Sequence, residues 1–262
     1  MEILIPIIIL GGLGLGFGLV LAIASKKFCV EADPRIEKIF SRLPGANCGA
    51  CGFPGCMGFA EGLIQGSCTV EKCTVSNEEA KEGIAKILGV KIKEEVKKVA
   101  TLHCFGGSRA KDKYTYQGIK DCVAANLVLG GQKACVYGCL GFGDCLRVCP
   151  FDAIKMSEDG LPLIDKDKCK ACNKCVEICP KKILSLSPLS GNVFVACSSH
   201  DLGKDTKASC PVGCIACKLC EKACPVSAIK VIDNVAVIDY DKCTSCGKCI
   251  DVCPMKTIRK RG

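Results

Sequence analysis

The chain contains no tryptophan, and only four tyrosines and nine phenylalanines occur among its 262 residues. With so few large apolar side chains, we expect several small modules instead of one large core. Neither of the two histidines flanks cysteines in a Rieske pattern, and no C-x-x-C-H haem motif or glycine-rich nucleotide loop occurs. These absences leave no evident group that gives or takes a hydride.

Charge is missing from residues 3–24, "ILIPIIILGGLGLGFGLVLAIA". A helix of this length spans a bilayer at about 1.5 Å per residue. A cleaved signal peptide would carry positive charge before the apolar run, whereas here Lys26 and Lys27 follow it. By the positive-inside rule, we expect residues 1–27 to form a single-pass anchor in the inner (cytoplasmic) membrane, with the rest of the chain on the cytoplasmic side.

Cysteine, by contrast, is abundant, with 26 in the chain. Disulfide frameworks are typical of short secreted domains, and most of these cysteines lie too close together in the chain to connect distant segments. The pattern therefore indicates metal ligation. The formal net charge is +9, but a cubane cluster with four thiolates carries about −2, so five clusters would bring the total to about −1. We therefore expect no nucleic-acid partner.

The first cysteine group lies in "ANCGACGFPGCMGFAEGLIQGSCTVEKC" (46–73). Cys48, Cys51 and Cys56 sit in a glycine-rich loop, where the backbone approaches closely and its N–H groups can point at sulfur. Three cysteines within nine residues favour a [4Fe-4S] cluster over structural zinc. From the residues alone, either Cys73 or Cys68 supplies the fourth ligand.

Two helices are expected after this loop. Phe59, Leu63 and Ile64 lie on one face of the first. The second is a charged helical stretch over residues 76–100, for which Asn77 is the expected N-cap. We interpret both helices as structural.

Four cysteine motifs, each ending in Cys-Pro, fill the second half of the chain. Three have the spacing C-x2-C-x2-C-x3-C-P, and the motif that begins at Cys135 has the looser spacing C-x3-C-x5-C-x3-C-P. Three sulfurs within seven residues wrap one face of a cubane, which tetrahedral zinc does not require. The fourth cysteine begins a helix that leads away, so it ligates the other cluster of a pair.

Taking the motifs in pairs predicts four clusters and their ligands. The expected sets are Cys135, Cys139, Cys145 and Cys179; Cys149, Cys169, Cys172 and Cys175; Cys214, Cys217, Cys220 and Cys253; and Cys224, Cys243, Cys246 and Cys249. Short hairpins are expected between paired motifs, at 153–165 and 228–239. The unit repeats after about 75 residues, which predicts two tandem ferredoxin-like domains at 134–190 and 205–262.

Six cysteines remain outside these sets: Cys29, Cys68, Cys104, Cys122, Cys197 and Cys210. We interpret them mainly as buried or incidental thiols, with a regulatory role or an additional metal ligand as the alternative. Residues 92–133, which include two of them, are expected to be a linker of uncertain structure. Cys210 lies just before a motif and competes with Cys214 as a ligand.

The order of these features resembles the B subunit of the Rnf complex, the ion-translocating ferredoxin:NAD oxidoreductase, which is also called an electron transport complex. The resemblance covers nearly the whole chain: a membrane helix, "NCGACGFPGC", a cysteine near 73, and ferredoxin motifs. Its most specific feature is C-x2-C-x4-C-x16-C, and it implies Cys73 as the fourth ligand of the first cluster. The second half looks like the longer versions of this protein.

The resemblance implies an α+β chain of small iron–sulfur modules: the membrane helix, an α-rich 4Fe-4S domain at 32–91, and two tandem bacterial-type ferredoxin domains. It implies five [4Fe-4S] clusters, other subunits of a membrane complex as partners, and soluble reduced ferredoxin as electron donor. Electrons would pass on towards NAD and drive Na⁺ or H⁺ across the membrane. The chain would be a relay with no catalytic residue and no NAD site of its own. The alternative is a polyferredoxin-like subunit of a membrane hydrogenase or related dehydrogenase, which has no need of the "NCGACGFPGC" module.

Overall fold

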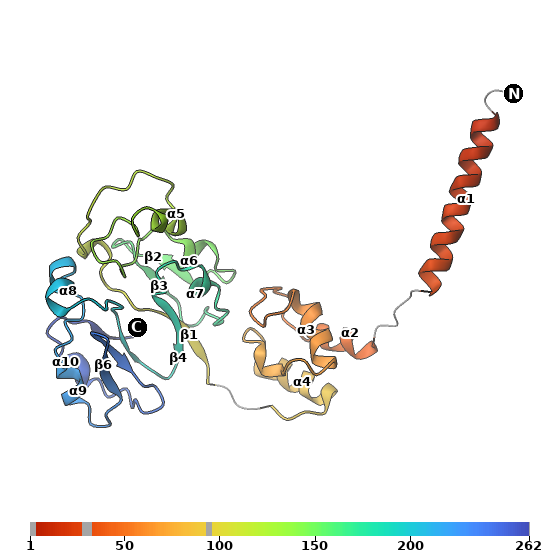
Figure 1. Ribbon diagram of the computed structural model, residues 1–262. Helices are drawn as coiled ribbons and strands as arrows, with labels where there is room; N and C mark the ends of the chain where they lie inside the picture. Colours follow the sequence, from red (N-terminus) through yellow and green to blue (C-terminus); the bar gives the residue numbers. More distant parts are fainter. Residues whose placement is uncertain (1–3, 28–32, 93–95, 262) are drawn as a thin grey trace.

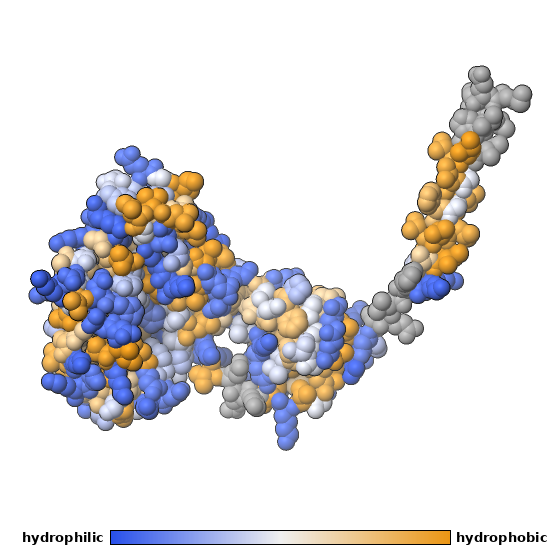
Figure 2. All heavy atoms as spheres, viewed as in Figure 1, coloured by the Kyte–Doolittle hydropathy of each residue, from blue (hydrophilic) through white to orange (hydrophobic). Residues whose placement is uncertain are grey.

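The structure is a computed structural model that describes residues 4–27, 33–92 and 96–261; Cys29 lies outside the described residues. Figure 1 shows three bodies along the chain: the helix α1, a helical module that contains α2, α3 and α4, and a part with all the strands. Helix α1 (Leu4–Lys27) is apolar on every side, and side chains such as Leu10 and Leu15 are largely exposed (Figure 2). Within the described ranges it is the one helix long and apolar enough to cross a membrane.

The helical module has a small core of its own. Its helices are α2 (Pro34–Phe40), α3 (Gly55–Ile64), the short η1 (Val70–Lys72) and α4 (Glu78–Leu88). Ile39, Phe59 and Ile84, one from each α-helix, are fully buried against one another. The predicted helix after the cysteine loop is therefore confirmed, with Phe59 and Leu63 on its buried face.

Helix α4 begins where the sequence predicts and ends earlier. The side chain of Asn77 accepts a hydrogen bond of 2.9 Å from the N–H of Ala80, as an N-cap does. The helix stops at Gly89, which has φ +70° and takes the left-handed conformation that glycine adopts most easily. The predicted helical stretch to residue 100 is wrong at its end, because residues 98–102 form a strand.

The strand-containing part consists of two repeats of the same plan. The first repeat, residues 98–188, comprises β1 (Lys98–Leu102), η2 (Gly107–Arg109), α5 (Cys122–Leu127), α6 (Asp144–Arg147), β2 (Ile154–Met156), β3 (Pro162–Ile164), α7 (Lys174–Ile178) and β4 (Leu184–Pro188). The second repeat, residues 193–260, comprises β5 (Val193–Val195), α8 (Gly203–Ser209), α9 (Leu219–Ala223), β6 (Ile229–Ile232), β7 (Val235–Ile238), α10 (Lys248–Asp251) and β8 (Ile258–Lys260).

Each repeat has two antiparallel strand pairs. The predicted hairpins are present as β2–β3, where Ile154 faces Ile164, and β6–β7, where Ile229 faces Ile238. The second pair in each repeat joins the strand before the cysteine motifs to the strand after them, as β1–β4 and β5–β8. Burial of Ile154 and Ile229 places a small apolar core beside the cysteines of each repeat.

The segment expected to be a linker belongs to the first repeat in the structure. Strand β1 lies in it, with Val99 and Ala100 buried against β4. Further along, Lys133 pairs with Asp112 at 3.0 Å, which closes the loop that carries α5. Local sequence does not reveal this arrangement because the partner strand β4 lies more than 80 residues away in the chain.

The two repeats pack directly on each other. Both ring nitrogens of His103, just after β1, form hydrogen bonds. Nδ1 lies 2.8 Å from the carbonyl oxygen of Val195, and Nε2 lies 2.7 Å from Oγ of Ser185. Burial lowers the pKa of His103. Arg261, after β8, donates to Oγ1 of Thr101 at 2.8 Å and thereby connects the end of the second repeat to β1 of the first.

Candidate metal centres

In the second repeat, cysteines surround two cavities of about 340 and 360 Å³. The cysteines of the larger cavity are Cys214, Cys217, Cys220 and Cys253. Those of the smaller cavity are Cys224, Cys243, Cys246 and Cys249. The structure therefore brings together the two sets of cysteines that the spacing predicts for this repeat.

In the first repeat, one cavity of about 340 Å³ has all four predicted cysteines, and another of about 400 Å³ has three of its predicted four. The first is lined by Cys149, Cys169, Cys172 and Cys175. The second is lined by Cys122, Cys139, Cys145 and Cys179. Here Cys122 takes the place expected for Cys135, which lies at a different cavity between the repeats. The structure thus departs from the expected grouping at one position.

A comparison of the two repeats explains this departure. The segment "CVYGCLGFGDCLRVCP" (135–150) has the same length as "CPVGCIACKLCEKACP" (210–225), and four cysteines and the final proline coincide. Phe142 stands at the position of Cys217. The motif of the first repeat therefore lacks its middle sulfur, and the sulfur of Cys122 reaches the cavity from α5. In the sequence, this alignment signals that the first motif lacks one ligand, and the structure identifies Cys122 as the candidate that replaces it.

The backbone around the middle position is the same with or without the cysteine. Residues on both sides of Cys172, Cys217 and Cys246 have positive φ values of 51° to 83°. Gly141 and Gly143, on both sides of Phe142, have φ values of 81° and 79°. The loop is thus retained in the first repeat, while the ring of Phe142 packs near Tyr116 with their centroids 5.5 Å apart.

The carboxylate of Asp144 holds Cys122 in place. Asp144 is buried, and its two oxygens accept from the N–H of Cys122, each at 3.0 Å, and from the N–H of Val123 at 3.2 Å. Arg147 forms an ion pair with Asp144 and donates to Asp121 at 3.1 Å. Because Asp121 also caps α5 through the N–H of Ala124, these charged groups fix the start of α5 beside the cavity.

Burial makes several of the thiols at these cavities weaker acids, because it raises their pKa. It raises the pKa of Cys145 to about 11 and that of Cys175 to about 12. In the second repeat it raises the pKa of Cys220 and of Cys249 to about 11. Thiolate is the form that binds metal, so loading of each cavity releases protons and becomes more favourable as the pH rises.

N–H groups of the backbone point at several of these sulfurs. The N–H of Ala228 donates to Sγ of Cys224 at 3.2 Å, and that of Thr257 donates to Sγ of Cys253 at 3.4 Å. Burial acts to raise the pKa of Cys224, but the backbone hydrogen bonds together outweigh it and lower the pKa. Bonds of this kind stabilise thiolate ligands and tune the potential of an iron–sulfur cluster.

The helical module places its cysteines around one core. Cys56 and Cys73 are buried there, and the less buried Cys51 packs against them. The side chain of Asn47 accepts from the N–H of Cys56 at 2.8 Å and so fixes the loop that begins with Cys48.

The core of the module also distinguishes the two candidates for its fourth ligand. Oγ of Ser76 donates to Sγ of Cys73 at 3.1 Å, a bond that stabilises a thiolate. Burial raises the pKa of Cys68, and its thiol donates a long hydrogen bond of 4.0 Å to the carbonyl oxygen of Phe59. These contacts favour Cys73 as the ligand.

The spacing of the sulfurs suits a cluster better than a single ion. Four thiolates around one zinc ion lie only about 3.8 Å apart, because each Zn–S bond is about 2.3 Å. Within residues 4–27, 33–92 and 96–261, no three cysteine, histidine, aspartate or glutamate side chains converge closely enough for a single metal ion. The sulfurs instead line separate pockets, with four cysteines around each, as the four-thiolate ligation of an iron–sulfur cubane requires.

Known protein families match both kinds of module. Residues 43–75 match the family described as a putative Fe-S cluster domain, and residues 133–183 and 208–257 each match the 4Fe-4S dicluster domain. A relative from Acetobacterium woodii, the B subunit of the Na(+)-translocating ferredoxin:NAD(+) oxidoreductase complex, is 49% identical over 98% of this chain and 78% of its own length. The B subunit of the ion-translocating oxidoreductase complex of Methanosarcina acetivorans is 43% identical over 97% of both chains. The B subunit of the proton-translocating ferredoxin:NAD(+) oxidoreductase complex of Clostridium ljungdahlii is 41% identical over 98% of this chain and 92% of its own length.

The chain belongs to the family formed by the B subunits of these complexes. The resemblance stated from the motifs is thereby confirmed, and so is the fold class: an apolar N-terminal helix, an Fe–S module and two 4Fe-4S dicluster domains. The family match extends through residues 43–75, the module for which the polyferredoxin alternative has no need.

Proposed function

We propose that this chain is the electron-relay subunit of a membrane complex that couples electron flow between reduced ferredoxin and NAD to the translocation of Na⁺ or H⁺. The observation that carries this proposal is the arrangement of four-cysteine cavities in two packed repeats, beside an Fe–S module and a helix suited to a membrane. The overall reaction is that named for the relatives from Acetobacterium woodii and Clostridium ljungdahlii.

The chain would hold a [4Fe-4S] cluster at each of five places. The ligands we propose are Cys48, Cys51, Cys56 and Cys73; Cys122, Cys139, Cys145 and Cys179; Cys149, Cys169, Cys172 and Cys175; Cys214, Cys217, Cys220 and Cys253; and Cys224, Cys243, Cys246 and Cys249. When bound, a [4Fe-4S] cluster takes up one electron and passes it on. The residues of the chain hold the sulfurs, exclude water and direct N–H groups at the thiolates.

The membrane helix indicates on which side of the membrane the relay lies, and the partners indicate in which direction the electrons flow. With Lys26 and Lys27 at its end, α1 orients the cysteine modules towards the cytoplasm by the positive-inside rule. Soluble reduced ferredoxin docks on these modules there and gives electrons to them. The chain passes the electrons to other subunits of the complex, where NAD is reduced, since it carries no nucleotide-binding loop of its own.

The test uses the complete membrane complex. A complex assembled with Cys175→Ala in this chain should lose most ferredoxin-dependent NAD reduction, because the relay is interrupted within the first repeat. Cys68→Ala is the matched control, a partly buried cysteine outside the proposed ligand sets, and should retain the activity. If a complex that lacks this chain altogether reduced NAD at an unchanged rate, this chain would not be the path by which electrons from ferredoxin enter the complex.

A further inference from the structure

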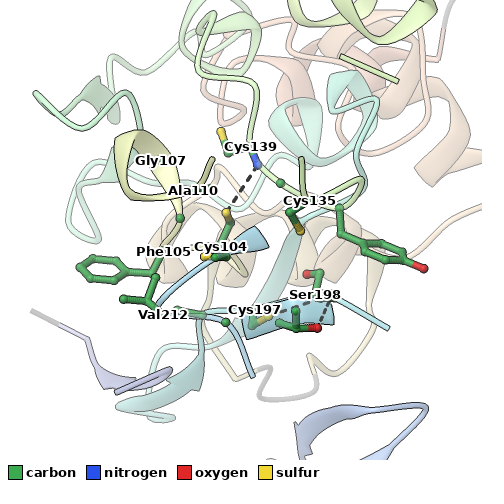
Figure 3. Close-up of a pocket in the computed structure, with 17 residues that line it drawn as sticks. Cys104, Phe105, Gly107, Ala110, Cys135, Cys139, Cys197, Ser198 and Val212 are labelled. Carbon is green, nitrogen blue, oxygen red and sulfur yellow. Dashed lines mark hydrogen bonds between the residues drawn. The ribbon is translucent and has the colours of Figure 1, made fainter. Parts of the chain in front are cut away.

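A fifth cavity of about 390 Å³ lies where the two repeats meet, and it too is lined by cysteines. Figure 3 shows Cys104, Cys135, Cys139 and Cys197 around it, together with glycine and other small residues. Cys210 completes the set of cysteines. The cavity has nearly the same volume as the four described above, yet three of its five cysteines belong to no motif of ferredoxin spacing.

These cysteines occupy equivalent positions in the two repeats. Cys104 follows the last residue of β1 by two positions, and Cys197 follows the last residue of β5 by two positions. Cys135 begins "CVYGC", and Cys210 begins "CPVGC". Each repeat therefore supplies one cysteine two positions after its first strand and one cysteine four positions before Cys139 or Cys214, and the four meet at the boundary.

The hydrogen bonds around these sulfurs are repeated as well. The N–H of Cys139 donates to Sγ of Cys104 at 3.4 Å, and the N–H of Cys214 donates to Sγ of Cys197 at 3.3 Å. The N–H of Ser199 gives Cys197 a second bond, at 3.4 Å. These are the same N–H to sulfur bonds that Cys224 and Cys253 receive in the regular motifs. Two sulfurs with no place in a ferredoxin motif thus have the surroundings of cluster ligands.

The backbone of Gly106 approaches two of these sulfurs closely, and a side chain at this position would crowd them. A Cβ atom added to Gly106 would lie 3.4 Å from Sγ of Cys210 and 3.7 Å from Sγ of Cys104. Cys135 and Cys210 are buried, so a group at this place is shielded from water. The lining is predominantly small and apolar, with no carboxylate among the lining side chains.

We propose that Cys104, Cys135, Cys197 and Cys210 hold a sixth [4Fe-4S] cluster, shared equally between the two repeats. The fifth cysteine of the cavity, Cys139, also lines the neighbouring cavity of the first repeat, where it completes a set of four. This division assigns every cysteine except Cys29 and Cys68 to a set of four.

The position of this cluster gives it a role, which rests on the proposed function. Cys139 borders both this cavity and a cluster cavity of the first repeat. On the other side, the N–H of Cys214 donates to Sγ of Cys197, and Cys214 lines a cluster cavity of the second repeat. The sixth cluster would accept one electron from the cluster of one repeat and give one electron to the cluster of the other. It would therefore join two separate pairs of clusters into one continuous path.

Native mass spectrometry of the full-length chain, purified without oxygen, tests this proposal by counting clusters. We expect six clusters in the wild-type chain, and five in Cys104→Ala and in Cys197→Ala, which affect equivalent positions. The double variant should also hold five, because both cysteines serve the same cluster. Ser198→Ala is the control at the same cavity: its hydroxyl donates to the carbonyl oxygen of His103 at 2.9 Å, and its loss should leave six clusters.

Several results would overturn the proposal. A fully loaded wild-type chain with five clusters would overturn the proposal without any variant. Because this count needs only the wild-type chain, it tests the sixth cluster even if the variants do not fold. Loss of two clusters in the double variant would show that the two cysteines serve different sites, and zinc at a stoichiometry of one would assign the cavity to a structural ion. Five clusters together with intact relay activity would reject the sixth site alone, whereas six clusters in a chain that is dispensable for NAD reduction would reject the proposed function alone.

Discussion

The two repeats have the same arrangement of four strands and two four-cysteine cavities each, but they build these cavities with different sequences. In the second repeat, one regular motif supplies Cys214, Cys217 and Cys220 to the first cavity. In the first repeat, Phe142 replaces the middle cysteine, and Cys122 brings the third sulfur from a separate helix. The comparison teaches that a cavity for a cluster depends on where the sulfurs lie in space, and that a fixed spacing along the chain is only one way to place them.

The largest effect should come from removing Cys122 and then restoring the regular motif. Cys122→Ala should cost one cluster, about four iron atoms per chain, because the cavity keeps only three sulfurs. Adding Phe142→Cys should restore it, because the glycines on both sides already give the loop the required backbone. Iron and sulfide analysis measures both changes.

The control for this rescue is Cys122→Ala with Phe142→Ala. It removes the same aromatic ring and its contact with Tyr116 but adds no sulfur, so the cluster should stay lost. If Cys122→Ala alone retains all the iron, the difference between the repeats that we describe is incorrect.

A smaller effect is expected from Asp144→Ala, which tests how the first repeat positions its distant ligand. The hydrogen bonds that the N–H groups of Cys122 and Val123 donate to the buried carboxylate would be lost, and a bond to a charged group is worth about 1.5–3 kcal/mol. We expect the thermal midpoint for bleaching of the cluster absorbance to fall clearly. Asp251→Ala, at the exposed end of α10, is the matched control and should change stability by no more than about 0.5 kcal/mol. Equal midpoints for the two variants would contradict this role of Asp144.

The smallest effect concerns the contact between the repeats. Arg261→Ala removes a donor to Oγ1 of Thr101 and to the carbonyl oxygen of Pro188, and we expect a loss of about 1–3 kcal/mol without loss of iron. Hydrogen exchange of the amides in β1 and β4 should become faster. The neighbouring Lys260→Ala, which changes an exposed side chain, should leave these rates as they are; equal protection in both variants would contradict the linking role of Arg261.

Most of the regular elements of this chain could be predicted from its sequence. The features that depend on contacts between residues far apart in the chain could not. The hairpins β2–β3 and β6–β7 were predictable because each lies between two cysteine motifs and alternates in hydrophobicity. The strand β1 was not, because it pairs with β4 only after the whole first repeat has intervened. Cys122 was missed for the same reason: its sulfur reaches the cavity through the bonds of Asp144, which no spacing rule describes.

The cysteines at the boundary of the repeats also depend on contacts between distant segments. Cys104 and Cys197 appear isolated in the sequence, with no second cysteine close by in a ferredoxin spacing. Their equivalence becomes visible only when β1 and β5 are known to be equivalent strands. Duplicated chains therefore carry information in the comparison of their halves that neither half shows alone.

The most direct test of the account is the iron and acid-labile sulfide content of the wild-type chain, purified without oxygen. Four iron atoms and four sulfides per cluster predict about 24 of each for six clusters. About 20 of each would contradict the cluster shared between the repeats and leave five. Zinc without sulfide would contradict the electron relay itself.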